Sequence, residues 1–292
     1  MVDQDAKQGA MMLSPIDRTR LEKTATDNGF DLEGATDGAW LPFASSQTSL
    51  RIWLRVLEGT LYIVAFSRRE VCAALPDLGA PWTKPLPAGA CAARGLAVAA
   101  SLHRLIRRAF QLSRALPDAP LQVFLQRTAS LPRTTEAERL VVQRVGQDLF
   151  RNGLLDYWEG TCPVSGLVVA ELLRASHIKP WAHCDTDAER LDVFNGLLLA
   201  PQLDAAFDRG FMTIDDAGRV IVSDRLDPAS RQVLGLDRSL SVHRLIDPHR
   251  VFLAWHREHV FIRSSASASD RVAPVTGGRA GVVPSSSKIT FP

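Results

Sequence analysis

The stretch from Cys162 to Gly210 constrains this chain most, because it sets chemically reactive side chains in order between short apolar segments. These side chains are His177, Asn195, Asp204 and Asp208. Pro180 ends the strand expected around the histidine, since proline cannot donate to a sheet ladder. One imidazole, one carboxamide and two carboxylates in this order favour a compact metal-dependent site for cutting phosphodiester bonds.

A short helix is predicted over residues 202–208, since a proline precedes it and a glycine follows its end. On this helix Asp204 and Asp208 are four residues apart and share one face. Two carboxylates on one face repel each other unless a positive group lies between them. A divalent cation is one candidate for that group, and Arg209 is the other.

Three motifs in the stretch carry a resemblance: Cys-Pro-Val-Ser-Gly at 162–166, Asn-Gly-Leu-Leu-Leu at 195–199 and Phe-Asp-Arg-Gly at 207–210. With the flanking segments 144–158 and 252–261, they make the C-terminal half similar to the HNH endonuclease family. The resemblance implies a β-hairpin and a helix that clamp one metal ion against the scissile phosphate of DNA. By analogy it also implies a role in restriction or phage defence.

The resemblance assigns roles to individual residues. His177 matches the general base that accepts a proton from water, and we also expect it near the metal. Asn195 matches the residue that orients the site, and Asn-Gly is a turn signal as well. Asp204 stands where many relatives carry a metal-binding histidine. Because carboxylates suit Mg²⁺ or Mn²⁺ and imidazole suits Zn²⁺, we expect Mg²⁺ or Mn²⁺, with Zn²⁺ as the alternative.

Ser176 is a departure from the family pattern, because many relatives carry an acidic metal ligand immediately before the base. We therefore expect Asp208 or substrate oxygens to complete the metal shell, although Asp208 pairing with Arg209 is an equal alternative. If the metal site is lost, the chain is a catalytically impaired nucleic-acid-binding or regulatory protein. An RNA substrate is a further alternative, since such a site contacts phosphates and not the sugar.

Several basic and polar side chains are candidates for contacting the nucleic-acid backbone: Arg104, Arg107, Arg108, Gln147, Arg151 and Lys179. Helical spacing places the first three on one face, which suits phosphate neutralisation and equally suits a solvated surface. Gln147 and Arg151 lie one helical turn apart and suit either phosphate contact or bracing of the hairpin, and we favour bracing. Gly146 is unfavourable inside a helix and indicates a close approach by another element.

The four cysteines form no Cys-x-x-Cys pair, and no secretory signal precedes them. We expect free thiols in a reducing cytoplasm; a zinc site built from Cys162, His183 and Cys184 is the disfavoured alternative. With 46% hydrophobic and 23% charged residues, the chain has the composition of a globular protein. No apolar run has membrane-spanning length, so a cytoplasmic protein without a membrane partner is expected. The net charge of +2 is low for a nucleic-acid binder.

The fold class predicted is α+β, with a small N-terminal α+β domain over 1–130 and a separate ββα-metal (HNH) nuclease domain over 134–263. A disordered tail is expected over 264–292, which is rich in Ser, Ala, Gly and Pro. The N-terminal domain is the expected contact for a second copy or a defence-system partner.

Within the N-terminal part, a helix is predicted near 16–28 and a hairpin over 50–66 with its turn at Glu58-Gly59. An alanine-rich helix is predicted over 89–115.

Overall fold

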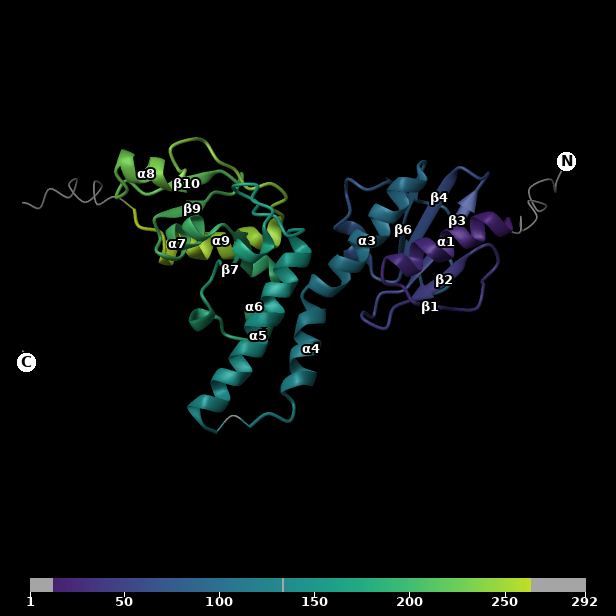
Figure 1. Ribbon diagram of the computed structural model, residues 1–292, viewed down its shortest axis with the longest axis horizontal. Coiled ribbons are helices and arrows are strands. Elements are labelled where there is room, and N and C mark those ends of the chain that lie inside the picture. The colour runs from purple at the N-terminus through teal and green to yellow at the C-terminus, as the bar shows by residue number, and fades with distance from the viewer. Residues whose placement is uncertain (1–12, 133, 264–292) are drawn as a thin grey trace, which may run out of the picture.

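The computed structural model describes residues 13–132 and 134–263. The predicted disordered tail, 264–292, lies outside these residues. The described part mixes helices with antiparallel sheets. Figure 1 shows two groups of elements, with α3 (Ala99–Ala115), α4 (Asp118–Thr128) and α5 (Glu136–Tyr157) running between them. Their buried apolar residues form one continuous cluster that extends from Leu21 to Leu253.

The N-terminal group is built on a six-stranded antiparallel sheet in the order β1-β2-β3-β4-β6-β5. Its strands are β1 (Leu32–Glu33), β2 (Leu41–Ala44), β3 (Ile52–Leu57), β4 (Leu61–Phe66), β5 (Ala80–Pro81) and β6 (Ala92–Leu96). The predicted hairpin is confirmed as β3 and β4, which pair from Ile52↔Phe66 to Leu57↔Leu61. Glu58 and Gly59 lie in its turn with positive φ angles of 51° and 69°, and the backbone N–H of Thr60 closes the turn on the Leu57 carbonyl oxygen.

Helices cover one face of this sheet. They are α1 (Pro15–Asp27), α2 (Arg69–Ala73) and α3, and α1 confirms the helix predicted near 16–28. Alternation along β3 directs Leu54 to this helical face, where the main core lies. It directs Trp53 to the opposite face, which has a smaller cluster with Trp40 and Ile63.

The helix predicted over 89–115 is wrong in its first part. Residues 92–96 form β6, which pairs with β4 on one side and β5 on the other, and the helix begins at Ala99. The buried guanidinium of Arg94 donates to the carbonyl oxygens of Cys72 and Gly79 at 3.3 and 3.0 Å. These long-range bonds and the sheet ladder outweigh alanine's local preference for helix.

The pair α4 and α5 lies side by side in Figure 1. At the start of α5, the side chain of Thr135 accepts from the backbone of Glu138, whose carboxylate accepts in return from Thr135, a capping box. A Cβ added at Gly146 would lie 2.6 Å from the ring of Trp181. This confirms the close approach that glycine indicated within the helix.

The C-terminal group contains two two-stranded sheets and four further helices. The strands are β7 (Arg174–His177), β8 (Gly196–Leu199), β9 (Met212–Ile214) and β10 (Val220–Val222). The helices are α6 (Asp187–Leu191), α7 (Pro201–Asp208), α8 (Pro228–Leu234) and α9 (Asp247–His259), with short 3₁₀ turns η2 (Ala170–Leu172), η3 (Trp181–His183) and η4 (Val193–Asn195). The antiparallel pair β7–β8 leads directly into α7, so two strands and a helix bring Ser176, Asp204 and Asp208 together.

Among the described helices, none combines the length and the apolar character that crossing a membrane requires.

Burial of histidines makes stability depend on pH. His249 and His256 on α9 have pKa values lowered to about 4 from 6.5, because burial disfavours the imidazolium. Between pH 6.5 and pH 4 the unfolded chain therefore binds more protons than the folded chain, and stability is lost as pH falls through this window.

We predict that the free energy of unfolding falls from about pH 7 to about pH 5, by on the order of 1 kcal/mol per pH unit for each buried histidine. Urea titrations at several pH values measure it. His256→Gln should reduce the slope, whereas His259→Gln, at an exposed position of the same helix, should leave it unchanged. A slope that is the same in all three proteins would contradict the assignment.

Candidate active site

Strand β7 separates two kinds of side chain. Its register places Ser176 opposite Leu197 and His177 opposite Gly196. Because successive side chains of a strand point to opposite faces, Ser176 is directed towards α7 and His177 towards α5. The contacts agree, since Ser176 bonds to aspartates of α7 and the His177 ring stacks on Phe150 of α5.

On the α7 side, Ser176, Asp204 and Asp208 form an oxygen cluster. The Ser176 hydroxyl donates to Asp204 Oδ1 at 2.7 Å and lies 3.4 Å from Asp208 Oδ1. One hydroxyl proton cannot satisfy both carboxylates fully. Partial burial and the negative charge of Asp204 raise the pKa of Asp208, against the opposing effects of Ser176 and Arg209. The two aspartates therefore repel each other, as their spacing predicted.

Arg209 does not relieve this repulsion by a direct contact. In the part of the chain that the structure describes, no ion pair joins Arg209 to Asp204 or Asp208, and its side chain is exposed. Arg209 therefore acts on Asp208 through its charge and not through a direct ion pair.

The donor set suits a hard cation that keeps part of its water shell. Mg²⁺ commonly takes one or two carboxylates and completes its shell with water and phosphate oxygens. Asp204, Asp208 and the Ser176 hydroxyl offer oxygen ligands of this kind. Within residues 13–132 and 134–263, no group of three or more His, Cys, Asp and Glu side chains is arranged to hold a metal. The structure thus brings Asp204 and Asp208 together without His177.

On the α5 side, the ring of His177 is held by three neighbours. It stacks on Phe150, with centroids 3.7 Å apart and planes 14° apart, and meets the edge of Trp181 at 5.6 Å. Its Nε2 lies 2.9 Å from the carbonyl oxygen of Arg190. A carbonyl only accepts, so Nε2 carries the hydrogen and Nδ1 is left with a free lone pair.

Burial also fixes the charge of this ring. It lowers the pKa of His177 to about 4, although the bond to the Arg190 carbonyl acts in the opposite direction. The imidazole is therefore neutral near pH 7, the state in which Nδ1 can accept a proton.

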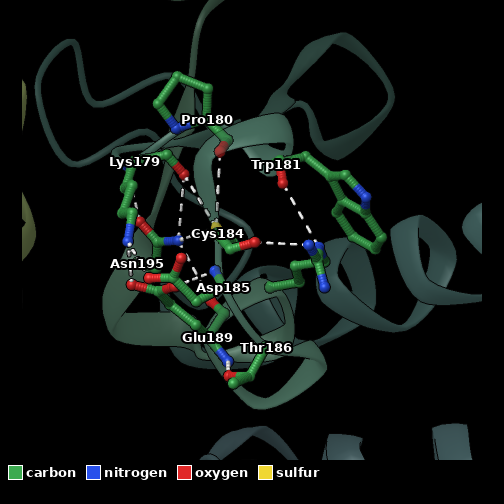
Figure 2. Close-up of polar contacts among 9 residues, drawn as sticks. Lys179, Pro180, Trp181, Cys184, Asp185, Thr186, Glu189 and Asn195 are labelled. Atoms are coloured by element: carbon green, nitrogen blue, oxygen red, sulfur yellow. Dashed lines mark hydrogen bonds and ion pairs between the residues drawn. The ribbon is translucent and has the colours of Figure 1, made fainter.

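Asn195 holds the loop that contains Trp181 and Arg190, and Figure 2 shows its contacts with Lys179, Cys184 and Glu189. Its Oδ1 accepts the backbone N–H of Lys179 at 2.7 Å. Its Nδ2 lies 3.2 Å from the carbonyl oxygens of Lys179 and Glu189, and the whole side chain is buried. The Asn195 side chain therefore holds the loop through hydrogen bonds, and none of its hydrogen bonds reaches the His177 ring.

The other predicted nucleic-acid contacts differ in what they touch. Three of them have partners within the protein. The Lys179 ammonium lies 2.7 Å from Glu189 and 3.2 Å from Asp185. Arg151 donates to the carbonyl oxygens of Ala170 and Leu173 at 3.0 and 2.7 Å, in the segment just before β7.

Arg108 also bonds internally, at 2.6 Å to the carbonyl oxygens of Asp156 and Tyr157. These are the last carbonyls of α5, which have no partner within the helix. Gln147, Arg104 and Arg107 are exposed. Of the four cysteines, Cys72, Cys162 and Cys184 are buried free thiols and Cys91 is a half-buried one.

Three residues that matter to the site escaped the sequence reasoning: Phe150, Trp181 and Arg190. The sequence contained one signal for the position of Trp181, because Gly146 indicated a close approach to the helix at that point. Arg190 had none, since it contributes a backbone carbonyl, which every residue has.

Comparison with known families agrees with the resemblance. Residues 162–215 match the model of the HNH endonuclease family. The matched segment contains β7, β8 and α7, and with them His177, Asn195, Asp204 and Asp208. No curated protein matches the chain.

We predict that Asn195→Ala lowers the free energy of unfolding by about 2 kcal/mol, because it leaves the buried N–H of Lys179 without an acceptor. Asp185→Asn removes an exposed ion pair in the same loop and should cost less than about 0.5 kcal/mol. Urea unfolding of the two variants measures both. Equal losses would show that the Asn195 carboxamide does not hold the loop.

Proposed function

We propose that the HNH segment of the C-terminal half is a divalent-metal-dependent endonuclease site that hydrolyses DNA phosphodiester bonds. The observation that carries the proposal is the state of His177. Its Nε2 is held by the Arg190 carbonyl at 2.9 Å, and burial keeps the ring neutral. A base with a fixed tautomer stands next in sequence to the oxygen cluster of Ser176, Asp204 and Asp208.

The substrate phosphate would lie along the edge of β7 that pairs with no strand among the described residues. There it would meet Nδ1 of His177 from one face of the strand and the carboxylates from the other. Nδ1 accepts the proton of the attacking water, and the Arg190 carbonyl stabilises the imidazolium that results. Asn195 acts through the loop and is a positioning residue.

Asp204 and Asp208 would hold the cation, with the Ser176 hydroxyl as a weaker ligand. A bound divalent cation supplies positive charge to the phosphate oxygens as the bond breaks. Oxygen donors favour Mg²⁺ or Mn²⁺ over Zn²⁺. A role in restriction or phage defence, with the N-terminal half contacting a partner or a second copy, is part of the proposal and rests on family analogy alone.

A second candidate is a nucleic-acid-binding protein that keeps the fold without catalysis. Ser176 favours it, because a hydroxyl stands where many relatives carry an acidic ligand. The two candidates differ in what a divalent cation does. The enzyme requires the cation for cleavage, whereas the binding protein leaves DNA intact with any cation.

We predict metal-dependent nicking or cutting of plasmid DNA. Mg²⁺ or Mn²⁺ should support faster cleavage than Zn²⁺, and EDTA should abolish cleavage. His177→Ala should lower the rate by about 10²- to 10⁴-fold, because the general base is lost. Asp204→Asn should raise the Mg²⁺ concentration needed for half-maximal rate. His243→Ala, at an exposed histidine, is the control and should cleave as the wild type does.

Thermal unfolding shows whether each variant is folded. Undiminished cleavage by a folded His177→Ala variant would show that His177 is not the general base. Intact plasmid with every cation, together with retained DNA binding, would instead establish the second candidate.

A further inference from the structure

A large cavity lies away from the polar cluster of β7 and α7. Its volume is about 1130 Å³, at the upper end of the range for ligand pockets. One wall comes from α3 and from the residues after α2, and the other comes from the end of α5, Phe194 and the segment 244–248. None of Ser176, His177, Asp204 and Asp208 lines it. The cavity therefore joins the two groups of elements and is distinct from the candidate active site.

Arginines are the most numerous charged residues of this cavity: Arg68, Arg104, Arg107, Arg108 and Arg244. Arg68 is paired with Glu70 at 2.6 Å, and Arg108 is held by the carbonyls at the end of α5. Arg104 and Arg107, one turn apart on α3, are exposed, and no hydrogen bond or ion pair joins them to another described residue. They are the guanidinium groups free to take a ligand.

The lining also includes four carboxylates, and two of them are paired with arginines of the cavity. Glu159 pairs with Arg244 and lies 3.5 Å from Arg108, while Glu70 pairs with Arg68. Asp77 and Asp118 are the other two acidic residues of the lining. An anion entering the cavity thus meets the unpaired charges of Arg104 and Arg107 beside these two aspartates.

The backbone at one wall is in an uncommon conformation. Glu159 and Arg244 have φ angles of 53° and 67°, in the left-handed region that non-glycine residues seldom adopt. The two residues form an ion pair with each other in the cavity wall. Glu159 directly follows the C-cap of α5, where a left-handed residue commonly ends a helix. Its ion pair joins this end of α5 to Arg244 across the cavity wall.

Apart from Gln111 and Tyr157, the remaining lining is apolar, with Leu112, Leu116, Phe194 and Ile246 among its residues. A cavity with free guanidinium groups on one helix and apolar walls around them suits an amphipathic anion. Guanidinium groups recognise phosphate oxygens through charge-assisted, bidentate hydrogen bonds. Flat rings bind against apolar side chains.

We propose that this cavity binds a small phosphorylated ligand of nucleotide chemistry. Arg104 and Arg107 hold its phosphates, and the apolar wall near Phe194 receives its base. The concave shape and the apolar lining favour a small ligand over duplex DNA, whose backbone is bound mainly by basic surfaces. The ligand would touch both groups of elements, so it would stabilise their arrangement. The proposal stands apart from the endonuclease function and does not require it.

Isothermal titration calorimetry of the full chain tests the proposal in EDTA, so that a metal-bound nucleotide at the active site does not contribute. The probes are ATP, GTP, the dinucleotide pApA, inorganic phosphate and a short DNA duplex. We expect ATP, GTP or pApA to bind with a dissociation constant on the order of micromolar. Whether the mononucleotides or pApA bind more tightly distinguishes the two sizes of ligand.

Arg104→Glu and Arg107→Glu should each weaken that binding by about tenfold or more. Arg127→Glu is the matched control, because Arg127 is an exposed arginine of α4 outside the cavity lining. Thermal unfolding confirms that the variants are folded. The proposal is overturned if no nucleotide binds, if the two α3 variants bind it as the control does, or if inorganic phosphate binds as tightly. Binding of duplex alone, lost in both variants, would overturn it in favour of a DNA contact.

Discussion

The hydrogen bond between His177 Nε2 and the carbonyl oxygen of Arg190 is the interaction on which the site depends. It fixes the tautomer of the half-buried imidazole and leaves Nδ1 as the proton acceptor. Much of the surrounding structure holds this bond in place. Phe150 on α5 stacks on the ring, and the buried carboxamide of Asn195 ties the loop that presents Arg190. The family resemblance assigns an orienting role to Asn195. In this structure its side chain holds the loop and makes no hydrogen bond to the His177 ring.

The second constraint is electrostatic. Asp204 and Asp208 occupy one face of α7, and the single proton of Ser176 cannot neutralise both. Partial burial, together with the negative charge of Asp204, raises the pKa of Asp208. Because Ser176 and His177 are neighbours on β7, the same short strand positions the oxygen cluster and the proposed base. This adjacency is the physical basis of the proposed reaction.

What the sequence predicted was mostly local. The β3–β4 turn at Glu58-Gly59, the helix that carries Asp204 and Asp208, and the close approach at Gly146 follow from residue chemistry over a few positions. Strand β6 could not be predicted in this way. Its alanines favour a helix locally, and the strand forms because of long-range pairing with β4.

The same limit applies to the site and the cavity. His177 was found from its motif, whereas its partner is a backbone carbonyl without a sequence signal. The arginines of α3 were expected along a phosphate backbone. Only the fold shows that Arg104 and Arg107 line a cavity shared with Phe194 and Arg244, which are distant in sequence.

The central claim is that Asp204 and Asp208 hold a divalent cation beside a neutral, metal-free His177. A crystal structure of the full chain grown with Mn²⁺, with anomalous diffraction recorded for manganese, tests it most directly. The account predicts an anomalous peak in direct contact with both carboxylates, absent in Asp204→Ala, with the His177 ring still bonded to the Arg190 carbonyl. A peak on His177, or none between the two aspartates, would contradict it.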